Sequence, residues 1–411
     1  MNRRYRIVVT GAGMGGLAAA ALLARDGHAV TLVERFQTPR PLGSGLVVQP
    51  VGMAVLDLVG AGDPARALGA GLTRMLGHSG ARVALDVSYR PDRPGVAMHR
   101  AALFDVLGHA MRTSGITPLT GRTVTGTVET ADAIHLATEA GALGPFDLIV
   151  DATGAGSPLS PLKARPLPFG AVWANVPWPK TDLPPDQLRQ HYQAARRMAG
   201  VLPIGRLPGD PTLRAAIFWS LSGAELDAWP GCDLDDWRGE VAAFWPAMAP
   251  FLAGVSDKAQ LTPARYSHGS LRRPWAGRLV HIGDAAHRAS PQLGQGANMA
   301  LLDAASLALA LRLPLDEASR AHQRARRGHL GLYQAMSAVF TPQYQSSSRV
   351  LPWLRDRVLA PLSRVPPLPR VLTAIVSGDI LPPVAGSRFP DIAWTSPPVR
   401  LGSNVAEKEN P

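Results

Sequence analysis

The sequence predicts an α/β fold: a domain built on a parallel sheet, a mainly antiparallel β module inserted into it, and a helical tail. Three observations predict this fold. Residues 6–34 read as a buried strand, a glycine turn, an alanine-rich helix and a second strand. From about residue 161 to 274, prolines and tryptophans gather and strand-like runs replace helices. Residues 278–282 form another apolar run, so the chain leaves its first domain and later re-enters it.

The remaining elements follow from apolar periodicity and from turn residues. Within the opening unit we expect strands at 6–10 and 29–34 and a helix at 17–26, which Gly27 ends. Further strands are expected at 83–88, 123–129, 146–152, 171–176, 213–221 and 278–282, and further helices at 52–59 and 101–113. The predicted domains are 1–160 with 275–318, a β module at 161–274, C-terminal helices at 319–395, and a tail at 396–411 that we expect to be disordered.

Prolines separate three predicted helices in the C-terminal part, at residues 321–340, 350–362 and 371–375. Arg355, Arg357 and Arg364 stand beside leucines and valines. This pattern allows two interpretations, a face that touches a membrane or helices that pack on the rest of the protein. Packing is the favoured interpretation.

Composition describes an ordinary globular protein. The 411 residues are 46% hydrophobic and 18% charged, enough for two or three domains with a sizeable core. The formal charge is +11, but nearly all of it is arginine, and no basic run is interleaved with aromatics, so we expect no nucleic-acid partner. Cys232 is the only cysteine, which excludes an intramolecular disulfide and fits a cytoplasmic location. The longest apolar runs fall short of the ~20 residues that span a bilayer.

The glycine turn has the spacing G-x-G-x-x-G at Gly11, Gly13 and Gly16. It leaves a strand, opens a helix and meets an acid, Glu34, at the end of the next strand, which is the context of a dinucleotide-binding turn. The first glycine permits the tight turn, the second lets the backbone approach a pyrophosphate, and the third lets helix and strand pack closely. The helix start offers free N–H groups to phosphates, and Glu34 can accept hydrogen bonds from ribose hydroxyls. Arg35 lies along the adenine or is a solvated neighbour.

A second motif distinguishes FAD from NAD. Residues 278–287 read Arg-Leu-Val-His-Ile-Gly-Asp-Ala-Ala-His, and residues 290–298 read Ser-Pro-Gln-Leu-Gly-Gln-Gly-Ala-Asn, followed by Asp303-Ala304. With Trp275 before it, this stretch resembles the FAD-dependent aromatic-ring hydroxylases, the single-component flavoprotein monooxygenases of the p-hydroxybenzoate hydroxylase type. Two shorter stretches agree: residues 43–50 resemble that family's loop beside the flavin, and residues 100–103 resemble its Arg-x-x-Leu. The resemblance covers roughly residues 6–311.

The resemblance implies a Rossmann-like FAD-binding domain and a substrate-binding β module. Asp284 would accept hydrogen bonds from the ribityl chain, and Gly294 and Gly296 would let the backbone lie against the isoalloxazine ring, with the following helix pointing its positive end at that ring. His287 is expected to be a structural part of the motif. The expected FAD-binding set is Gly11, Gly13, Met14, Gly15, Gly16, Glu34, Arg35, Arg100, Val124, Asp284, Pro291, Gly294, Gly296, Ala297 and Asn298.

The sequence departs from the family at one turn. Many relatives carry Asp-Gly with a later Ser and Arg, whereas here Thr153 stands where the Asp would be and Ser160 where the Arg would be. Asp151 either compensates or faces solvent. The departure puts in doubt how well NAD(P)H reduces the flavin. No second G-x-G-x-x-G unit is visible, which agrees with a nicotinamide that docks only transiently.

The resemblance implies that NADPH or NADH reduces FAD and that O2 adds at the flavin C4a position to give a hydroperoxide, which hydroxylates a small aromatic substrate. We name no catalytic base, because a phenol or an amine supplies its own electrons. We expect the pocket between the flavin and the β module, with Trp173, Phe218, Trp219 and Pro291 as candidate lining, although core packing also explains the aromatics.

Other classes remain as alternatives. The chain could be an FAD-dependent reductase or dehydrogenase resembling the geranylgeranyl reductases, or an FAD-binding protein without turnover. A halogenase is disfavoured because no Trp-x-Trp-x-Ile-Pro run occurs. The histidines lack ligand spacing, so we expect no metal site, and we expect a monomer or a homodimer.

Overall fold

The computed structural model describes residues 4–38 and 43–386. Its first domain is built on a five-stranded sheet in which four strands run parallel and only the edge strand β17 is antiparallel. The central strand β1 is buried on both faces, with Ile7, Val8 and Val9 fully inaccessible, as expected for a parallel sheet covered on two sides. The sheet order is β17 (Trp275–Ala276), β18 (Leu279–His281), β11 (Leu148–Asp151), β1 (Arg6–Thr10) and β2 (Ala29–Val33).

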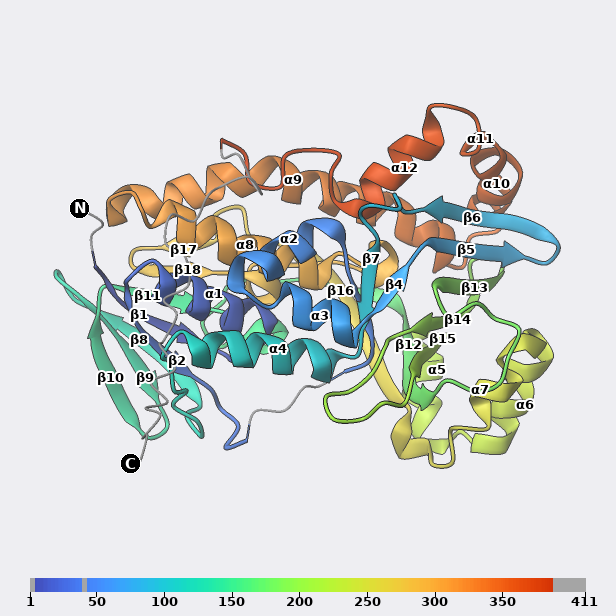
Figure 1. Cartoon of the computed structure of the whole chain (residues 1–411), viewed down its shortest axis with the longest axis horizontal. Coiled ribbons are helices and arrows are strands. Elements are labelled where there is room, and N and C mark those ends of the chain that lie inside the picture. The colour runs from blue at the N-terminus through green and yellow to red at the C-terminus, as the bar shows by residue number, and fades with distance from the viewer. Residues whose placement is uncertain (1–3, 39–42, 387–411) are drawn as a thin grey trace, which may run out of the picture.

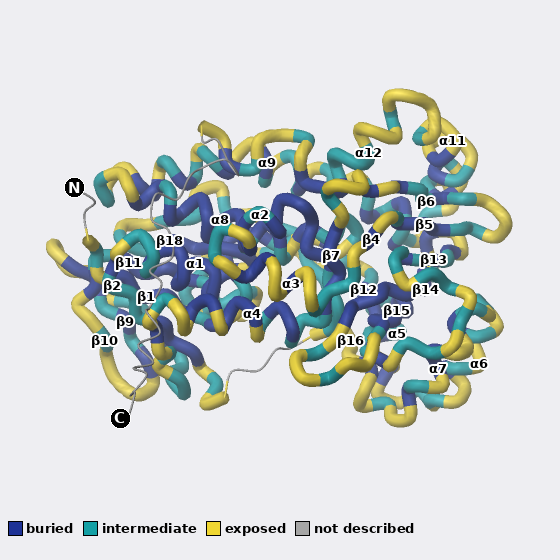
Figure 2. The backbone as a smooth tube through the Cα atoms, viewed as in Figure 1, coloured by how far each residue is buried: buried dark blue, intermediate teal, exposed yellow. Residues whose placement is uncertain are grey.

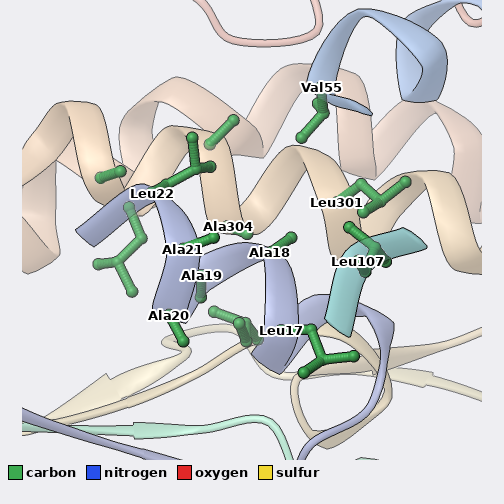
Figure 3. Packing of buried hydrophobic residues seen from close by; sticks show 14 of the residues in the cluster. Leu17, Ala18, Ala19, Ala20, Ala21, Leu22, Val55, Leu107, Leu301 and Ala304 are labelled. Carbon is green, nitrogen blue, oxygen red and sulfur yellow. The ribbon is translucent and has the colours of Figure 1, made fainter. Parts of the chain in front are cut away.

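Helices pack on one face of this sheet. The helix α1 begins at Met14, earlier than the predicted Leu17, because the glycine turn already forms its first turn with Gly13 as N-cap. Small residues let α1 approach α8 closely, and Figure 3 shows Ala18 and Ala21 of α1 on the side that faces Ala304 of α8. The helices of this layer are α1 (Met14–Arg25), α2 (Pro50–Val59), α3 (Gly62–Leu68), α4 (Arg100–Thr113) and α8 (Gly296–Ala310).

An antiparallel meander covers the opposite face. It consists of β8 (Val124–Glu129), β9 (Ile134–Thr138) and β10 (Gly141–Phe146), which bury Val8 and Ile149 of the parallel sheet. The predicted strand 146–152 is therefore wrong in its limits: residue 146 ends β10, and β11 starts at Leu148. Asp147 separates the two strands, because its carboxylate accepts hydrogen bonds from the backbone and side chain of Arg6.

The second unit is an eight-stranded, mostly antiparallel sheet, at the right of Figure 1. It contains β5 and β6, which precede residue 160, because β5 pairs in parallel with β13. The sheet thus includes strands from both sides of the predicted limit at residue 160, and the division into domains stays a prediction. The order is β19 (His287–Arg288), β16 (Thr262–Ser270), β12 (Arg165–Pro177), β15 (Arg214–Ser222), β14 (Arg197–Pro203), β13 (Gln187–Gln193), β5 (Arg74–Ser79) and β6 (Arg82–Ser88).

The two faces of this sheet have different partners. One face packs on α5 (Gly223–Ala228), α6 (Leu234–Phe244) and α7 (Ala249–Leu252) around Trp237 and Phe251. The other face meets the first domain and the C-terminal helices. A small sheet of β3 (Leu46–Val48), β7 (Gly95–Met98) and β4 (Ala70–Leu72) joins the two units. The sequence interpretation expects the substrate pocket between the flavin and the β module, which is the second of these two faces.

The C-terminal part is helical, as predicted. The long α9 (Leu315–Tyr344) crosses the top of Figure 1 from the first domain toward the large sheet. It is followed by α10 (Val350–Leu354), a π-helical turn (Arg355–Leu359), α11 (Ala360–Leu362) and α12 (Leu368–Ser377), gathered at one corner beside β5 and β6. Among the helices of residues 4–38 and 43–386, none combines the length and apolarity needed to cross a bilayer. The predicted α/β fold with an inserted β module and helical tail is confirmed; the tail at 396–411 lies outside the described residues.

Candidate cofactor site and active site

A groove of about 440 Å³ opens at the carboxyl end of the parallel sheet, where the glycine turn meets the Gly283–Ala285 turn. Ligands of open α/β sheets bind at this edge. Ten residues of the expected FAD-binding set line the groove: Gly11, Gly13, Met14, Gly15, Glu34, Arg35, Arg100, Asp284, Gly296 and Ala297. Segments almost 300 residues apart in sequence thus converge on one site.

The three motif glycines have different surroundings. Gly11 has φ +92°, and a Cβ there would lie 2.6 Å from the backbone oxygen of Ala152. A Cβ on Gly16 would overlap the backbone oxygen of Gly11. A Cβ on Gly13, by contrast, would meet no protein atom within 4 Å. Gly11 and Gly16 therefore pack the turn, while Gly13 leaves space at the helix start that fits a pyrophosphate.

Glu34 both closes the turn and faces the groove. Its Oε2 accepts a hydrogen bond from the Ala12 N–H at 2.7 Å, and its Oε1 accepts one from the Phe36 N–H at 3.0 Å. Each carboxylate oxygen can accept more than one hydrogen bond, so acceptors remain for a ribose. The Arg35 guanidinium stacks on the Phe36 ring at 4.6 Å, and Val124 lines an adjoining hollow of about 210 Å³ with Glu34 and Arg35. This end of the groove suits the adenosine half of FAD.

Arg100 and Asp284 face each other across the middle of the groove. Arg100 is the first residue of α4, whose N-cap is His99, and its buried Nε has no partner among the described residues. Burial lowers the pKa of Arg100, and the nearby Asp284 carboxylate opposes that shift. The Asp284 side chain is exposed in the groove and makes no hydrogen bond within the described chain. An orphaned donor and a free acceptor in one groove fit a polar cofactor such as FAD.

The turn before α8 lies at the other end of the groove. Pro291 starts a short 3-10 turn, and Gly294 follows it with φ +61°. The buried Asn298 holds this turn against the loop at residues 43–50: its Nδ2 donates to the carbonyls of Gly294 (2.9 Å) and Val47 (3.1 Å), and its Oδ1 accepts from the Gln49 N–H (2.8 Å). Asn298 therefore positions both loops, and its direct contact with FAD stays a prediction.

Gln49 belongs to the stretch 43–50 that resembles the family's loop beside the flavin, but the expected FAD-binding set does not include it. It is fully buried, its Oε1 accepts from the Tyr89 hydroxyl at 2.8 Å, and its Nε2 has no described partner. A Cβ on Gly294 would lie 3.4 Å from that nitrogen, so the amide sits at the turn expected beside the flavin ring. The available signal was a polar residue between the apolar run 46–48 and Pro50.

The departure at Thr153 and Ser160 forms a closed hydrogen-bonded unit. Asp151 is fully buried and does not face solvent: it accepts from the Thr153 hydroxyl (2.6 Å), the Ser157 hydroxyl (2.6 Å) and His281 Nδ1 (2.8 Å). Burial raises the pKa of Asp151, but these hydrogen bonds outweigh burial and hold it below its ordinary value. Ser160 donates to the carbonyl of Ala285 at 2.5 Å. The unit links β11 to the turn that presents Asp284.

His287 lies away from the groove in a buried ionic network. Its Nε2 lies 2.6 Å from Asp303 Oδ2, and Arg326 Nε donates to Asp303 Oδ1 at 2.8 Å. All three side chains are at most 5% exposed, so the network joins α8, α9 and the motif strand β19 inside the protein. This arrangement agrees with the expected structural role of His287.

The candidate aromatics separate to the two faces of the large sheet. Trp173 and Phe218 pair across β12 and β15 with ring centroids 4.6 Å apart, and Trp173 Nε1 donates to the Tyr266 hydroxyl at 2.9 Å. The prediction that Trp219 lines the pocket is wrong: it lies 1% exposed in the core against α6. Neighbouring residues on a strand point to opposite faces, so Phe218 and Trp219 cannot share one pocket.

A second cavity lies beyond the 291–296 turn. This apolar pocket of about 450 Å³ lies between the large sheet and the C-terminal helices. Gln292 and Leu293 line it, while Gly296 and Ala297 line the cofactor groove, so the 291–296 turn lies between the two cavities. Its other walls include Met75 of β5, Tyr192 of β13, Phe340 of α9, Leu362 of α11 and Leu372 of α12.

Comparisons with known proteins agree with this site. The chain matches the family described as FAD binding domain over residues 4–155 and 248–325, more than half of its length. It is 29% identical over 395 residues to the “Probable 2-heptyl-3-hydroxy-4(1H)-quinolone synthase” of Rhodococcus erythropolis (89% of this chain, 93% of that one). It is 28% identical over 365 residues to the 3-amino-4-hydroxybenzoate 2-monooxygenase of Streptomyces cremeus (80% and 87%). The structure of Klebsiella pneumoniae HpxO complexed with FAD and uric acid matches with a TM-score of 0.76 at 20% identity (90% and 96%).

The matched ranges contain every residue of the expected FAD-binding set. The similar proteins support the hydroxylase interpretation and not the reductase or the FAD-binding protein without turnover. The groove supplies polar groups and open backbone that fit a dinucleotide, and a separate cavity lies on the other side of the 291–296 turn. The chain thus belongs to the FAD binding domain family and is an FAD-dependent monooxygenase of the aromatic-ring hydroxylase type.

Proposed function

We propose that the enzyme hydroxylates a neutral aromatic ring that carries an apolar chain, such as a 2-alkyl-4(1H)-quinolone, and that NADPH or NADH supplies the electrons. The observation that carries this proposal is the apolar pocket beside the 291–296 turn. Its volume of about 450 Å³ suits a small molecule with an extended substituent. The heptyl-quinolone name of the Rhodococcus relative agrees with this chemistry.

The charges in the pocket argue against a carboxylate substrate. Among the described residues that line it, the charged ones are Asp86 and Arg355. Asp86 forms a two-point ion pair with Arg74, with both contacts at 2.7 Å. All three nitrogens of the buried Arg355 are engaged, with Asp356 (2.6 Å) and with the carbonyls of residues 343 (2.8 Å) and 194 (3.2 Å). A carboxylate would find no free cation there, and its desolvation would be uncompensated.

Polar groups remain to orient a neutral ring. Gln292 projects from the turn at the flavin end, and its buried Nε2 has no partner among the described residues. Gln190 of β13 also lines the pocket, with its Oε1 accepting from the Tyr192 hydroxyl at 2.9 Å. An unpaired amide donor beside apolar walls suits the carbonyl of a quinolone. We propose that Gln292 positions the ring while Leu293 and the C-terminal helices exclude water.

Bound FAD supplies the redox chemistry that activates O2 at the ring. The chain's own contribution is to hold the substrate at the turn before α8 and to keep the site dry, because water at an open site uncouples oxygen use from hydroxylation. The helix α8 points its N-terminus toward that end of the groove, where its dipole stabilises negative charge. Trp173, Phe218 and Pro291 remain proposed as further lining on the cofactor side. A cytoplasmic location and a monomeric or homodimeric state also stay predictions.

The test is turnover of the FAD-loaded enzyme with 2-heptyl-4(1H)-quinolone and with 4-hydroxybenzoate. We expect the quinolone to accelerate NAD(P)H oxidation, to consume O2 and to yield a product heavier by one oxygen atom. We expect 4-hydroxybenzoate to be poorer by at least about tenfold in kcat/KM, corresponding to ~1.4 kcal/mol. A reversed preference would overturn the substrate assignment.

A pair of variants in the β5–β6 hairpin tests the pocket directly. Ala84 is 5% exposed and lines the pocket, so Ala84→Phe should fill part of it and lower kcat/KM for the heptyl substrate by about tenfold or more. The shorter 2-methyl-4(1H)-quinolone should be affected less. Ala81 is exposed in the connecting turn, outside the pocket, so Ala81→Phe is the matched control. Equal effects of Ala84→Phe on both chain lengths would contradict the proposal.

A further inference from the structure

Exposed apolar side chains concentrate at one corner of the molecule. The C-terminal corner, residues 349–371, holds seven of the thirteen exposed large apolar side chains in the described part of the chain. Val350 is 70% exposed, Trp353 54%, Val365 53% and Leu362 49%. Figure 1 places this corner at one end of the molecule, above β5 and β6, and Figure 2 shows exposed backbone there. The helices pack inward through other residues, such as Arg355 and Ala360, so packing does not account for the four exposed apolar side chains that do not line the pocket: Val350, Trp353, Val358 and Val365.

The same corner is positively charged without compensation. Arg349, Arg357, Arg364 and Arg370 are exposed, and none forms an ion pair within the described chain. The one acid among residues 349–371 is Asp356, which is largely covered and bonded to Arg355 at 2.6 Å. A charge of about four arginines among exposed Trp, Leu and Val is the pattern of a segment that lies in the interface of an anionic bilayer.

The mouth of the apolar pocket lies within this corner. Leu359, Leu362 and Val371 line the pocket and are also at least 36% exposed, so they connect its interior with the surface. An apolar molecule dissolved in a bilayer could enter the pocket here without crossing water. This continuity joins the exposed patch to the site, whereas a patch meant for an unrelated partner would need no such opening.

We propose that the C-terminal corner docks on the surface of a bilayer that contains anionic lipid. Trp353, Leu362 and Val365 enter the interface, and Arg357 and Arg364 contact the head groups. The charge selects this occupant over a second copy of the chain, because two copies would bring their uncompensated arginines together. The proposal does not rest on the substrate assignment, since it concerns binding without turnover.

The experiment is sedimentation of the full-length FAD-loaded enzyme with vesicles of phosphatidylcholine alone or mixed with phosphatidylglycerol. We expect at least about tenfold tighter binding to the mixed vesicles, weakening as NaCl is raised. The variant Arg357→Gln/Arg364→Gln should lose about tenfold or more in affinity. The matched control is Arg112→Gln/Arg324→Gln, which removes the same charge from exposed positions on α4 and α9 and should bind as the wild type does.

A second measurement reports whether Trp353 enters the bilayer, independently of the charge of the corner. Brominated lipid in the mixed vesicles should quench Trp353 fluorescence, and Trp353→Phe should remove that quenching while binding persists. Equal binding to neutral and anionic vesicles, or equal losses in the two arginine pairs, would overturn the proposal. The proposal would also be overturned if the enzyme bound no vesicles but self-associated, and if Arg357→Gln/Arg364→Gln changed that self-association. None of these outcomes changes what the turnover test with the quinolone would show, so the two proposals can fail separately.

Discussion

The glycine turn yields the sharpest test of the cofactor site, because two of its glycines differ in what a methyl group would meet. In Gly16→Ala the new Cβ would overlap the Gly11 oxygen, and Gly11 is itself held by its hydrogen bond to Val33 at 2.7 Å and by its close approach to Ala152. No flexible side chain can yield there, so we expect a destabilisation of about 3 kcal/mol, the upper end of overpacking. That corresponds to a fall in Tm of roughly 3–4 °C for the apoprotein, because the entropy of unfolding of a 411-residue chain is about 0.9 kcal/mol/K.

Gly13→Ala should behave differently. Gly13 has φ −73° and ψ 178°, which alanine adopts freely, and its Cβ would meet no protein atom within 4 Å. Loss of a good N-cap costs about 1 kcal/mol at most. The methyl group would instead occupy space expected for the pyrophosphate, costing about 1–3 kcal/mol of binding, or about 5–150-fold in the Kd for FAD.

The assay pairs thermal unfolding of the two apoproteins with FAD titration followed by quenching of flavin fluorescence. We expect a large Tm loss in Gly16→Ala and a large affinity loss with nearly native Tm in Gly13→Ala. The reasoning is refuted if Gly13→Ala binds FAD like the wild type, or if its apoprotein loses as much Tm as Gly16→Ala.

Three further predictions concern buried charge. Asp303→Asn removes the negative charge and one of the two acceptor oxygens that His287 and Arg326 share. It should lower the free energy of unfolding by about 3–5 kcal/mol in denaturant titrations, and a loss below about 1 kcal/mol would contradict a paired network. Burial lowers the pKa of His322 to about 4 in the folded protein. As the pH falls below 6.5, His322 is therefore protonated in the unfolded chain but not in the folded one, which favours unfolding. The contribution of His322 alone should therefore lower stability by up to about 2 kcal/mol between pH 7 and pH 5. His329, whose pKa burial also lowers to about 4, adds to this loss, and His322→Asn should remove the His322 part, as urea midpoints at the two pH values will show. Arg100→Met removes a buried Nε that lacks a partner, so FAD affinity should fall about tenfold while apoprotein stability is kept; unchanged affinity would exclude the cofactor contact.

Much of the cofactor site could be predicted because its chemistry is local. A tight turn between a strand and a helix needs glycines at fixed spacing, and an acid at the end of the next strand lies beside that turn in any such unit. Gly11, Gly13 and Glu34 therefore lie where the sequence predicts them. Apolar periodicity likewise predicted β1 and β2 to within one residue, whereas the first C-terminal helix, predicted at 321–340, runs from Leu315 to Tyr344.

What remained open depends on pairing between distant segments. The parallel pairing of β5 with β13 joins residues more than 100 positions apart, and no local sequence pattern predicts it. Because side chains alternate along β15, Phe218 and Trp219 cannot line the same pocket. Which of the two side chains faces the first domain depends on the elements that pack on each face of the sheet.

The amino-acid sequence was enough to predict that this chain binds a dinucleotide at a glycine turn and carries the hydroxylase motif, because backbone turns and helix termini are specified by short runs of residues. The burial of Asp151, the unpaired Gln49 amide beside Gly294 and the apolar pocket walled by C-terminal helices were visible only in the three-dimensional arrangement. Those properties come from packing between elements far apart in the chain, where register and burial, rather than local residue type, set what each side chain contacts.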